Sequence, residues 1–335
     1  MKVKILILAV ATLLFVLSGC DASDSSPASF TRTEFALGTF VTVRIDGTSG
    51  KDANQALDGT FARLSEIELT ASTKNHGSEL SYVNQNAYER GITVSEELFF
   101  LLESGLFYSA LTDGAFDITL GSVVELWGIG TDNARVPAPD ELAEALENSG
   151  FENLLLSAEN RTVRFLKEGL KIDLGALAKG YAADEMKRVL LENGVTSAVL
   201  NLGGDIITIG DKNGEDWLIG LADPLAPGES CAILRVSGLA VVTSGNYERY
   251  FMHEGARYHH VFDSQTGFPA ESGVVSSTII TDSAMIADAL STAFFVMGIE
   301  RAVEFAVSIP DTDYVLIDGG MNFMCSENIN LEIIK

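Results

Sequence analysis

The chain has 335 residues, of which 47 are acidic and 22 are basic, so its formal net charge is −25 at pH 7. Binding a nucleic-acid backbone requires clusters of Lys and Arg, and this balance therefore excludes a nucleic-acid-binding protein. If so acidic a chain handles a phosphorylated small molecule, a bound cation or a local basic group must help it.

The N-terminus has the pattern of a secretory signal. Lys2 and Lys4 precede an apolar run over residues 5–17, which is shorter than the roughly 20 residues that span a bilayer. The run ends in Leu-Ser-Gly-Cys at Cys20, which resembles the lipobox of bacterial lipoproteins. The alternative is an ordinary signal peptide with an incidental cysteine.

The lipobox pattern implies three segments. We expect a signal peptide over residues 1–19, a lipidated (palmitate-bearing) Cys20 that opens a polar tether over residues 20–32, and a folded domain over residues 33–335. The protein would then be exported and anchored to a membrane by its lipid. Asp21 resembles a retention signal for the inner membrane, at its periplasmic face, if the host is Gram-negative.

Hydrophobic periodicity predicts a single α+β domain. Helices come first, and a strand-rich stretch over residues 152–281 precedes a late helix pair, which favours α+β over alternating βαβ units. The individual elements that the pattern predicts are a strand at 35–45, helices at 52–69 and 96–111, a helix opened by Pro137 and Pro139, helices at about 283–298 and 300–308, and a strand at 313–318.

The stretch KIDLGALAKGYAAD, residues 171–184, predicts the end of a strand followed by a helix. Asp173 leaves the strand, and Lys179 follows on the first helical turn. Gly175 and Gly180 lack a side chain, and glycine permits the close approach of a backbone to a ligand.

The predicted helix 283–298 is almost entirely apolar or small, which indicates burial on most sides. A carboxylate inside it must be paired, because an isolated buried charge is costly. Asp288 and Thr292 lie one turn apart on the same face, and together they offer two oxygen ligands for a hard cation such as Mg²⁺. The alternative is that Asp288 caps a neighbouring segment while Thr292 bonds its own helix.

The segment TSGNYERYFMHEGARYHHVFDSQTG, residues 243–267, contains His253, His259 and His260, three of the four histidines. His260 precedes Asp263 by three positions, and a carboxylate can orient an imidazole for acid–base catalysis. The alternative is a histidine that only bonds a turn. Cys231 and Cys325 are compatible with either a disulfide or buried thiols.

Together these motifs make the chain similar to the ApbE family of FAD:protein FMN transferases over residues 33–335. The motifs that carry the resemblance are LGT at 37–39, DGAFDITLGSVVELWGIG at 113–130, DLGALAKGY at 173–181, NLGGD at 201–205, TSGNY at 243–247, HVFDSQTG at 260–267 and ADALSTA at 287–293.

The resemblance implies a T-fold-like α+β domain that cleaves FAD, releases AMP and joins FMN to a threonine of a partner protein. A respiratory or redox membrane subunit is the expected partner. The resemblance places Mg²⁺ on Asp288, Thr292 and the carbonyl of Ala176, and acid–base chemistry on His260 and Asp263. The positions it implies for contact with the flavin nucleotide are Leu37, Lys74, Ala115, Phe116, Asp117, Asp173, Lys179 and His259.

Other functions remain open at this level. One is an FAD pyrophosphatase, in which water replaces threonine at the same site. Another is a non-catalytic flavin-binding lipoprotein. A solute-binding lipoprotein would require two α/β lobes, which the pattern does not predict. Lys74 stands where some family members have an aromatic residue, so the balance between transfer and hydrolysis is left open.

Overall fold

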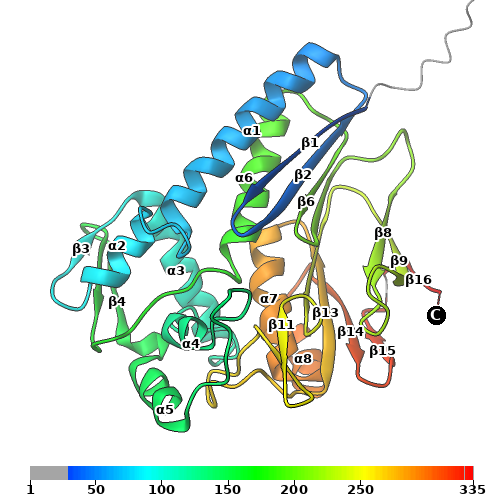
Figure 1. Cartoon of the computed structure of the whole chain (residues 1–335). Coiled ribbons are helices and arrows are strands. Elements are labelled where there is room, and N and C mark those ends of the chain that lie inside the picture. The colour runs from blue at the N-terminus through cyan, green and yellow to red at the C-terminus, as the bar shows by residue number, and fades with distance from the viewer. Residues whose placement is uncertain (1–28, 328, 335) are drawn as a thin grey trace, which may run out of the picture.

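An eight-stranded antiparallel sheet forms the centre of the structure, a computed structural model that describes residues 29–327 and 329–334 (Figure 1). The predicted α+β class is confirmed. The signal peptide, Cys20 and most of the tether lie outside the described residues. Residues 29–32, expected in the tether, instead belong to the first strand. Within the described ranges, no helix is both long and apolar enough to cross a membrane.

The strands of the central sheet follow the order β1-β2-β6-β7-β10-β13-β14-β15. Their bounds are β1 Ser29–Ala36, β2 Thr39–Asp46, β6 Ala198–Leu202, β7 Asp205–Ile209, β10 Ala240–Gly245, β13 Val274–Thr281, β14 Asp313–Asp318 and β15 Phe323–Cys325. Three small sheets accompany it, namely β3 (Ile92–Thr93) with β5 (Thr162–Phe165) and β4 (Leu154–Ser157), β16 (Leu331–Ile333) with β9 (Ser230–Val236) and β8 (Trp217–Ala222), and the hairpin β11 (Tyr250–His253) with β12 (Ala256–His259).

Helices α1, α6 and α7 pack on one face of the central sheet, and α4 and α5 form a separate apolar cluster (Figure 1). Their bounds are α1 Gly50–Ala71, α2 Glu79–Asn86, α3 Glu96–Leu111, α4 Gly121–Trp127, α5 Pro139–Asn148, α6 Ala178–Glu192, α7 Ala284–Met297 and α8 Ile299–Ala306. All the predicted helices are present. Two short helices, α2 and α4, were not predicted, because each is too brief to show a clear period in the sequence.

The central strands are buried on both faces. On β10, Val242 packs into the helical core, whereas its neighbour Val241 packs against the β8–β9–β16 sheet on the other side. Ile279 and Ile280 divide in the same way on β13. Because successive side chains on a strand point to opposite faces, such uninterrupted apolar runs are expected only in a sheet covered twice. The domain therefore has three layers.

The predicted strand 35–45 is wrong, because the chain reverses within it. β1 and β2 form a hairpin in which Ala36 faces Thr39, and Leu37 and Gly38 make the turn with φ of 51° and 72°. Positive φ at both central residues is typical of the two-residue turns that match the twist of a hairpin. The turn projects the LGT motif toward the middle of the molecule (Figure 1).

Helices α6 and α7 cap each other, because a carboxylate on each helix accepts backbone N–H groups near the N-terminus of the other. The Asp184 carboxylate on α6 accepts the backbone N–H groups of Ala284 and Met285, at 2.8 and 3.0 Å. In return, Asp288 on α7 accepts the N–H of Gly180, at 3.1 Å. Carboxylates are favourable at helix N-termini, where N–H groups lack partners within the helix. This exchange brings the two most distinctive motifs of the sequence together.

Gly180 lies where the two helices cross, and we expect Gly180→Ala to lower the free energy of unfolding by about 3 kcal/mol. A Cβ on Gly180 would lie 2.2 Å from the carbonyl oxygen of Ala284, and a helix backbone cannot yield as a side chain can. Urea unfolding followed by circular dichroism measures the effect.

Gly59→Ala is the matched control, because Gly59 also lies inside a helix at a helix contact. Its added Cβ would meet only a Val189 methyl at 3.4 Å. This variant should be neutral or more stable by about 0.5–1 kcal/mol. Equal unfolding midpoints for the two variants would refute a tight crossing at Gly180.

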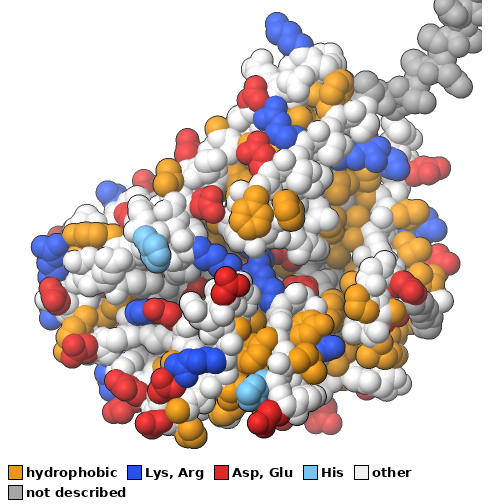
Figure 2. Space-filling view, in the orientation of Figure 1, with side chains coloured by type: hydrophobic (Ala, Val, Ile, Leu, Met, Phe, Trp, Pro, Cys, Tyr) orange, Lys and Arg blue, Asp and Glu red, His pale blue; other side chains and the backbone are white. Residues whose placement is uncertain are grey.

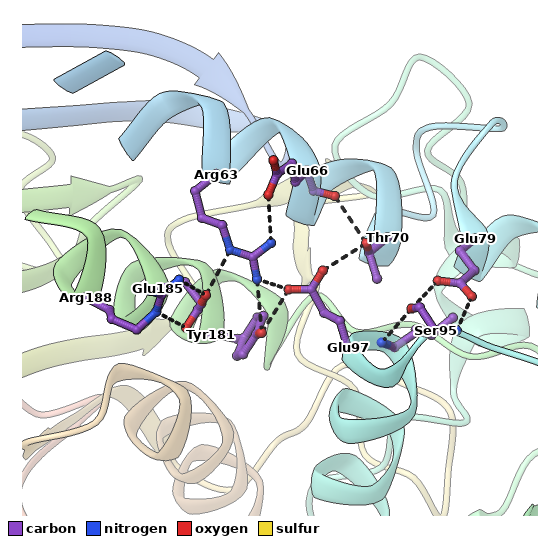
Figure 3. A network of polar contacts seen from close by, with 10 residues as sticks. Arg63, Glu66, Thr70, Glu79, Ser95, Glu97, Tyr181, Glu185 and Arg188 are labelled. Carbon is purple, nitrogen blue, oxygen red and sulfur yellow. Dashed lines mark hydrogen bonds and ion pairs between the residues drawn. The ribbon is translucent and has the colours of Figure 1, made fainter. Parts of the chain in front are cut away.

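A polar network ties α6 to α1 and α3 (Figure 3). The Arg63 guanidinium on α1 donates to Glu97 on α3, and to Glu185 on α6 at 2.9 Å. Tyr181, on α6, donates its hydroxyl to Glu97 at 2.9 Å. These side chains are about four-fifths buried, where screening by solvent is reduced. The network therefore fixes the helix whose first turn carries Lys179.

Candidate active site

The face of the molecule in Figure 2 is hollowed near its middle, below the β1–β2 turn and beside the start of α6, and charged side chains of both signs gather there. The segments that meet at this hollow are far apart in the sequence. They are the β1–β2 turn, the segment before α6, the β6–β7 turn, the end of β10 and the start of α7.

Two buried carboxylates share one lysine at the bottom of this region. Lys179 Nζ lies 2.8 and 3.0 Å from the two oxygens of Asp288, and 2.9 Å from Oδ2 of Asp205. The exposed fractions of Asp205 and Asp288 are only 4% and 2%. Lys179 was expected to contact a nucleotide, and the structure shows it bonded to carboxylates. Asp205 was not among the predicted site residues.

The charges of this cluster are strongly coupled. Burial alone would lower the pKa of Lys179, but the carboxylates of Asp205 and Asp288 raise it above its ordinary value. Burial raises the pKa of Asp205, and the charge of Asp288 raises it further, against the opposing effect of Lys179. Two carboxylates and one ammonium leave a deficit of positive charge, which a further cation would neutralise.

The predicted metal ligands are oxygen donors, as expected. Thr292 and Ala176 are partly exposed, whereas Asp288 is buried. Asp288 caps Gly180, as the alternative interpretation requires, but Thr292 does not bond its own helix. Its hydroxyl instead lies 3.2 Å from Oγ of Ser244, on β10. Ala176 lies in the turn that precedes α6. Carboxylate, hydroxyl and carbonyl oxygens are the ligands that Mg²⁺ prefers.

A test of fit for a divalent cation comes from Asp205. Its Oδ2 atom is buried and receives no hydrogen bond of acceptable geometry among the described residues, although Lys179 lies within ion-pair distance. No cluster of three or more His, Cys, Asp or Glu that could hold a metal occurs in the described part of the chain. The buried Asp205 oxygen and the oxygen donors named above suit an ion that takes few protein ligands and completes its shell with phosphate oxygens or water, as Mg²⁺ does.

Asp173 and the β1–β2 turn form one rim of the site. The Asp173 carboxylate accepts the N–H of Gly175 at 2.8 Å and the hydroxyl of Thr73 at 3.2 Å. Lys74, next to Thr73, is exposed, and its amino group lies beside Gly38. The partial burial of its side chain, and then the nearby charge of Arg249, lower the pKa of Lys74. The segment before Asp173 contains only an isolated bridge at Lys171, so the predicted strand end there is an extended segment.

Within the hairpin turn, Leu37 is partly buried and donates its N–H to Glu68 at 3.0 Å. Arg249 donates to the carbonyl of Gly38, at 3.4 Å. Both contacts hold the turn against the hollow, and Leu37 and Lys74 lie together there, while their predicted contact with the flavin stays a prediction. Sequence analysis missed Arg249, although it lies within the quoted histidine-rich segment.

Residues 115–117 lie beside Asp173, because the N–H of Asp173 donates to the carbonyl of Ile118 at 2.8 Å. Ala115 and Phe116 are buried, with exposed fractions of 6% and 2%, so their side chains belong to the core. The predicted contact of residues 115–117 with the flavin nucleotide stays a prediction. Asp117 accepts both the N–H and the hydroxyl of Thr119, and burial raises its pKa.

The expected orientation of His260 by the Asp263 carboxylate is wrong, because each side chain bonds the backbone instead. Asp263 Oδ1 accepts the N–H groups of Gln265 and Thr266, at 2.7 and 3.2 Å, and so closes its own turn. His260 Nδ1 lies instead 3.3 Å from the carbonyl oxygen of Arg249. Donation from Nδ1–H to that oxygen would leave Nε2 as a proton acceptor.

His259, which was expected to contact the flavin, is buried, with an exposed fraction of 6%. Its Nδ1 accepts the N–H of Val261 at 3.3 Å, which leaves the proton on Nε2 to be donated to the carbonyl of Ala270 at 3.2 Å. The ring packs edge-on against Phe295. Both ring nitrogens therefore bond the backbone, and the predicted flavin contact of His259 stays a prediction.

We expect the two histidines to make the folded protein less stable as the pH falls below about 6.5. Burial lowers the pKa of His259 to about 4, and burial together with Arg249 lowers that of His260 to about 3. In the unfolded chain both titrate near 6.5, so acid protonates the unfolded state first. Each histidine then costs up to about 1.4 kcal/mol per pH unit between 6.5 and its folded pKa.

Urea unfolding at pH 7.5, 6.0 and 5.0 measures this slope. His260→Gln should reduce the dependence of the free energy of unfolding on pH by the contribution of one titrating proton. His253→Gln, at an exposed position on β11, should leave this dependence unchanged. An identical slope in wild type and His260→Gln would contradict the lowered pKa.

The two cysteines do not form a disulfide in the structure. Cys231 is buried on β9, with its sulfur 3.5 Å from the carbonyl oxygen of Ala222, and Cys325 is partly buried on β15. Both side chains belong to the core between the central sheet and the β8–β9–β16 sheet. Of the two alternatives, the structure therefore supports buried thiols.

Comparison with known proteins identifies the relatives of this chain. A model described as the ApbE family matches residues 37–316. An FAD:protein FMN transferase of Treponema pallidum is 36% identical over 304 residues, which cover 86% of this chain and 84% of the relative. Another, of Vibrio cholerae, is 32% identical over 331 residues, which cover 96% and 97%.

Solved structures agree with the sequence matches. The structure of the ApbE protein of Thermotoga maritima superposes with a TM-score of 0.82 at 36% identity, over 90% of this chain and 97% of that chain. The flavin transferase ApbE of Vibrio cholerae superposes with a TM-score of 0.80 at 28% identity, over the same shares.

Proposed function

This chain belongs to the ApbE family and is an FAD:protein FMN transferase, and we propose that it moves FMN from FAD to a threonine hydroxyl of an acceptor protein with the help of a divalent cation. The acceptor oxygen attacks the phosphorus of the FMN half, the bond to the AMP phosphate breaks, and the hydroxyl proton leaves. AMP is the second product.

The buried cluster of Asp205, Asp288 and Lys179 carries this proposal. The pyrophosphate of FAD is anionic, and the chain is strongly acidic, so the substrate needs positive charge within the site. A divalent cation held by Asp288, Thr292 and the carbonyl of Ala176 would supply most of that charge and stabilise the leaving phosphate. Lys179 supplies the only side-chain cation bonded to this carboxylate pair in the described structure.

The remaining residues bind and orient the substrate. The turn at Leu37, together with Lys74 and Asp173, forms the rim that would receive the flavin nucleotide. His260 lies near Lys179 and Arg249, close enough for their charges to lower its pKa, so its imidazole is neutral at physiological pH. A neutral Nε2 is the group that would accept the proton of the acceptor hydroxyl.

The experiment that tests this function uses the purified protein with FAD, Mg²⁺ and an acceptor protein that carries a target threonine. Covalent flavin fluorescence on the acceptor and AMP release are followed together. We expect both to appear at equal rates and to vanish with a chelator, and replacing the threonine by valine should abolish the fluorescence. AMP release without any flavinylated acceptor would identify the protein as an FAD pyrophosphatase instead.

We further propose that the protein is exported and held on a membrane by a lipid on Cys20. The support is the sequence alone, since the apolar run ends in the lipobox-like Leu-Ser-Gly-Cys. We expect Cys20→Ser to leave the activity unchanged while releasing the protein from the membrane fraction. Unchanged membrane association of this variant would refute the anchor. A redox membrane subunit would then be a suitable acceptor, because both proteins would share one membrane surface.

A further inference from the structure

Both oxygens of the Asp288 carboxylate, proposed above as the metal ligand, already contact protein donors. Lys179 contacts both of its oxygens, at 2.8 and 3.0 Å, and Gly180 donates to Oδ2 at 3.1 Å. A divalent cation that ligates this carboxylate directly would stand against an ammonium 2.8 Å from the same oxygen. The two cations repel each other, so they cannot share the carboxylate without rearrangement.

Asp205 offers the ammonium a second position. Its Oδ2 lies 2.9 Å from Lys179 Nζ, yet this buried oxygen receives no hydrogen bond of acceptable geometry. A small rotation of the lysine side chain would complete the bond to Asp205 and give up Asp288. The lysine chain has four rotatable bonds, whereas both carboxylates are buried and fixed.

We propose that Lys179 is a cation that competes with the divalent metal for Asp288, and that Asp205 is the carboxylate that receives Lys179 when the metal binds. This inference rests on the proposed metal site. Its consequence is that the protein alone binds a divalent cation weakly. Nucleotide phosphates, which bring further oxygen ligands and negative charge, then favour loading of the metal together with FAD.

The test measures binding of Mn²⁺, a spectroscopic substitute for Mg²⁺, by electron paramagnetic resonance in the absence of FAD. Lys179→Met keeps the length of the side chain and removes the charge. It should bind Mn²⁺ at least about tenfold more tightly than the wild type, because the competing cation is gone. If Lys179 contributes only to nucleotide binding, Lys179→Met will leave Mn²⁺ affinity unchanged, and the proposal is overturned.

Lys187→Met is the matched control. Lys187 lies on the same helix and carries the same charge, but it donates to the carbonyl oxygens of Gly238 and Asp282, at 3.1 and 3.3 Å. Its loss should leave Mn²⁺ binding at the wild-type level. An equal gain in both lysine variants would mean that net charge, and not competition for Asp288, sets the affinity.

Asp205→Asn distinguishes reception of the lysine from direct ligation. If Asp205 receives Lys179, the variant should weaken Mn²⁺ binding several-fold in the wild-type background and have little effect in the Lys179→Met background. If Asp205 is itself a ligand, the loss will be the same in both backgrounds, and its proposed role fails.

Failure of the metal site itself gives a different result. Asp288→Asn should abolish Mn²⁺ binding in every background. Wild-type affinity in that variant would refute the metal assignment under the proposed function. Abolished binding in Asp288→Asn with unchanged binding in Lys179→Met would retain the metal site and refute only the competition.

Discussion

Asp288→Asn should abolish FAD cleavage, with a loss of at least about 10³-fold in the rate of AMP release. The amide keeps the shape of the side chain and can still accept the N–H of Gly180. It loses the formal charge on which binding of a hard cation depends, however. The change therefore removes the proposed metal ligand while preserving most of the contact between α6 and α7. AMP release at saturating FAD, measured over a range of Mg²⁺ concentrations, is the readout.

Asp184→Asn is the matched control for this variant, because the two acids hold the same pair of helices from opposite sides. Asp184 accepts the N–H groups at the start of α7 and the hydroxyl of Ser283, away from the Lys179 cluster. A comparable loss of stability but normal activity is expected. The assignment of Asp288 is wrong if Asp288→Asn cleaves FAD at the wild-type rate in the presence of a chelator.

His260→Gln should slow transfer of FMN by roughly 10²–10⁴-fold at neutral pH and leave FAD binding nearly intact. The acceptor hydroxyl is weakly acidic and must lose its proton as it attacks phosphorus. The neutral imidazole can take that proton, and the negative charge of bound phosphates would raise its pKa from the low value of about 3. The deficit should shrink as the pH rises, since hydroxide then replaces the missing base.

Flavin fluorescence on the acceptor from pH 6 to 9 gives the profile, and FAD binding is measured separately by quenching. His253→Gln, at an exposed position, should transfer at the wild-type rate. If His260→Gln flavinylates as fast as wild type at pH 7, another group is the base. Since Asp263 is committed to its own turn, the next candidate would have to come from the carboxylates around Lys179.

Much of this site could be predicted because its motifs combine chemistry with local geometry. Asp288 inside an almost wholly apolar helix required a partner, for which the sequence offered a cation or the N–H groups of a neighbouring segment, while Lys179 was assigned to the nucleotide. The structure joins these two residues directly. Asp205 was missed because the Gly203-Gly204 turn does not indicate whether the first residue of the strand that follows it is buried.

The two neighbouring histidines show a different limit. β12 ends at His259, and adjacent side chains near a strand end point to opposite sides, so only one of the pair could face the hollow. The sequence already indicates this alternation, but the family resemblance assigned both histidines to the site. The DSQTG pattern likewise permits an Asp that bonds the backbone two residues on, and the structure shows this turn at Asp263.

The β1–β2 hairpin also sets a distance. The strand enters at Ser29, paired with Asp46, and reverses at Leu37 and Gly38 beside the site. An eight-residue strand that rises ~3.4 Å per residue is roughly 24 Å long. The proposed site therefore lies about one strand length away from Ser29, where β1 begins. If Cys20 carries the proposed lipid, lengthening the chain between Cys20 and β1 would extend the reach of the site, but shortening it would not bring the site closer to the start of β1 than the length of the hairpin.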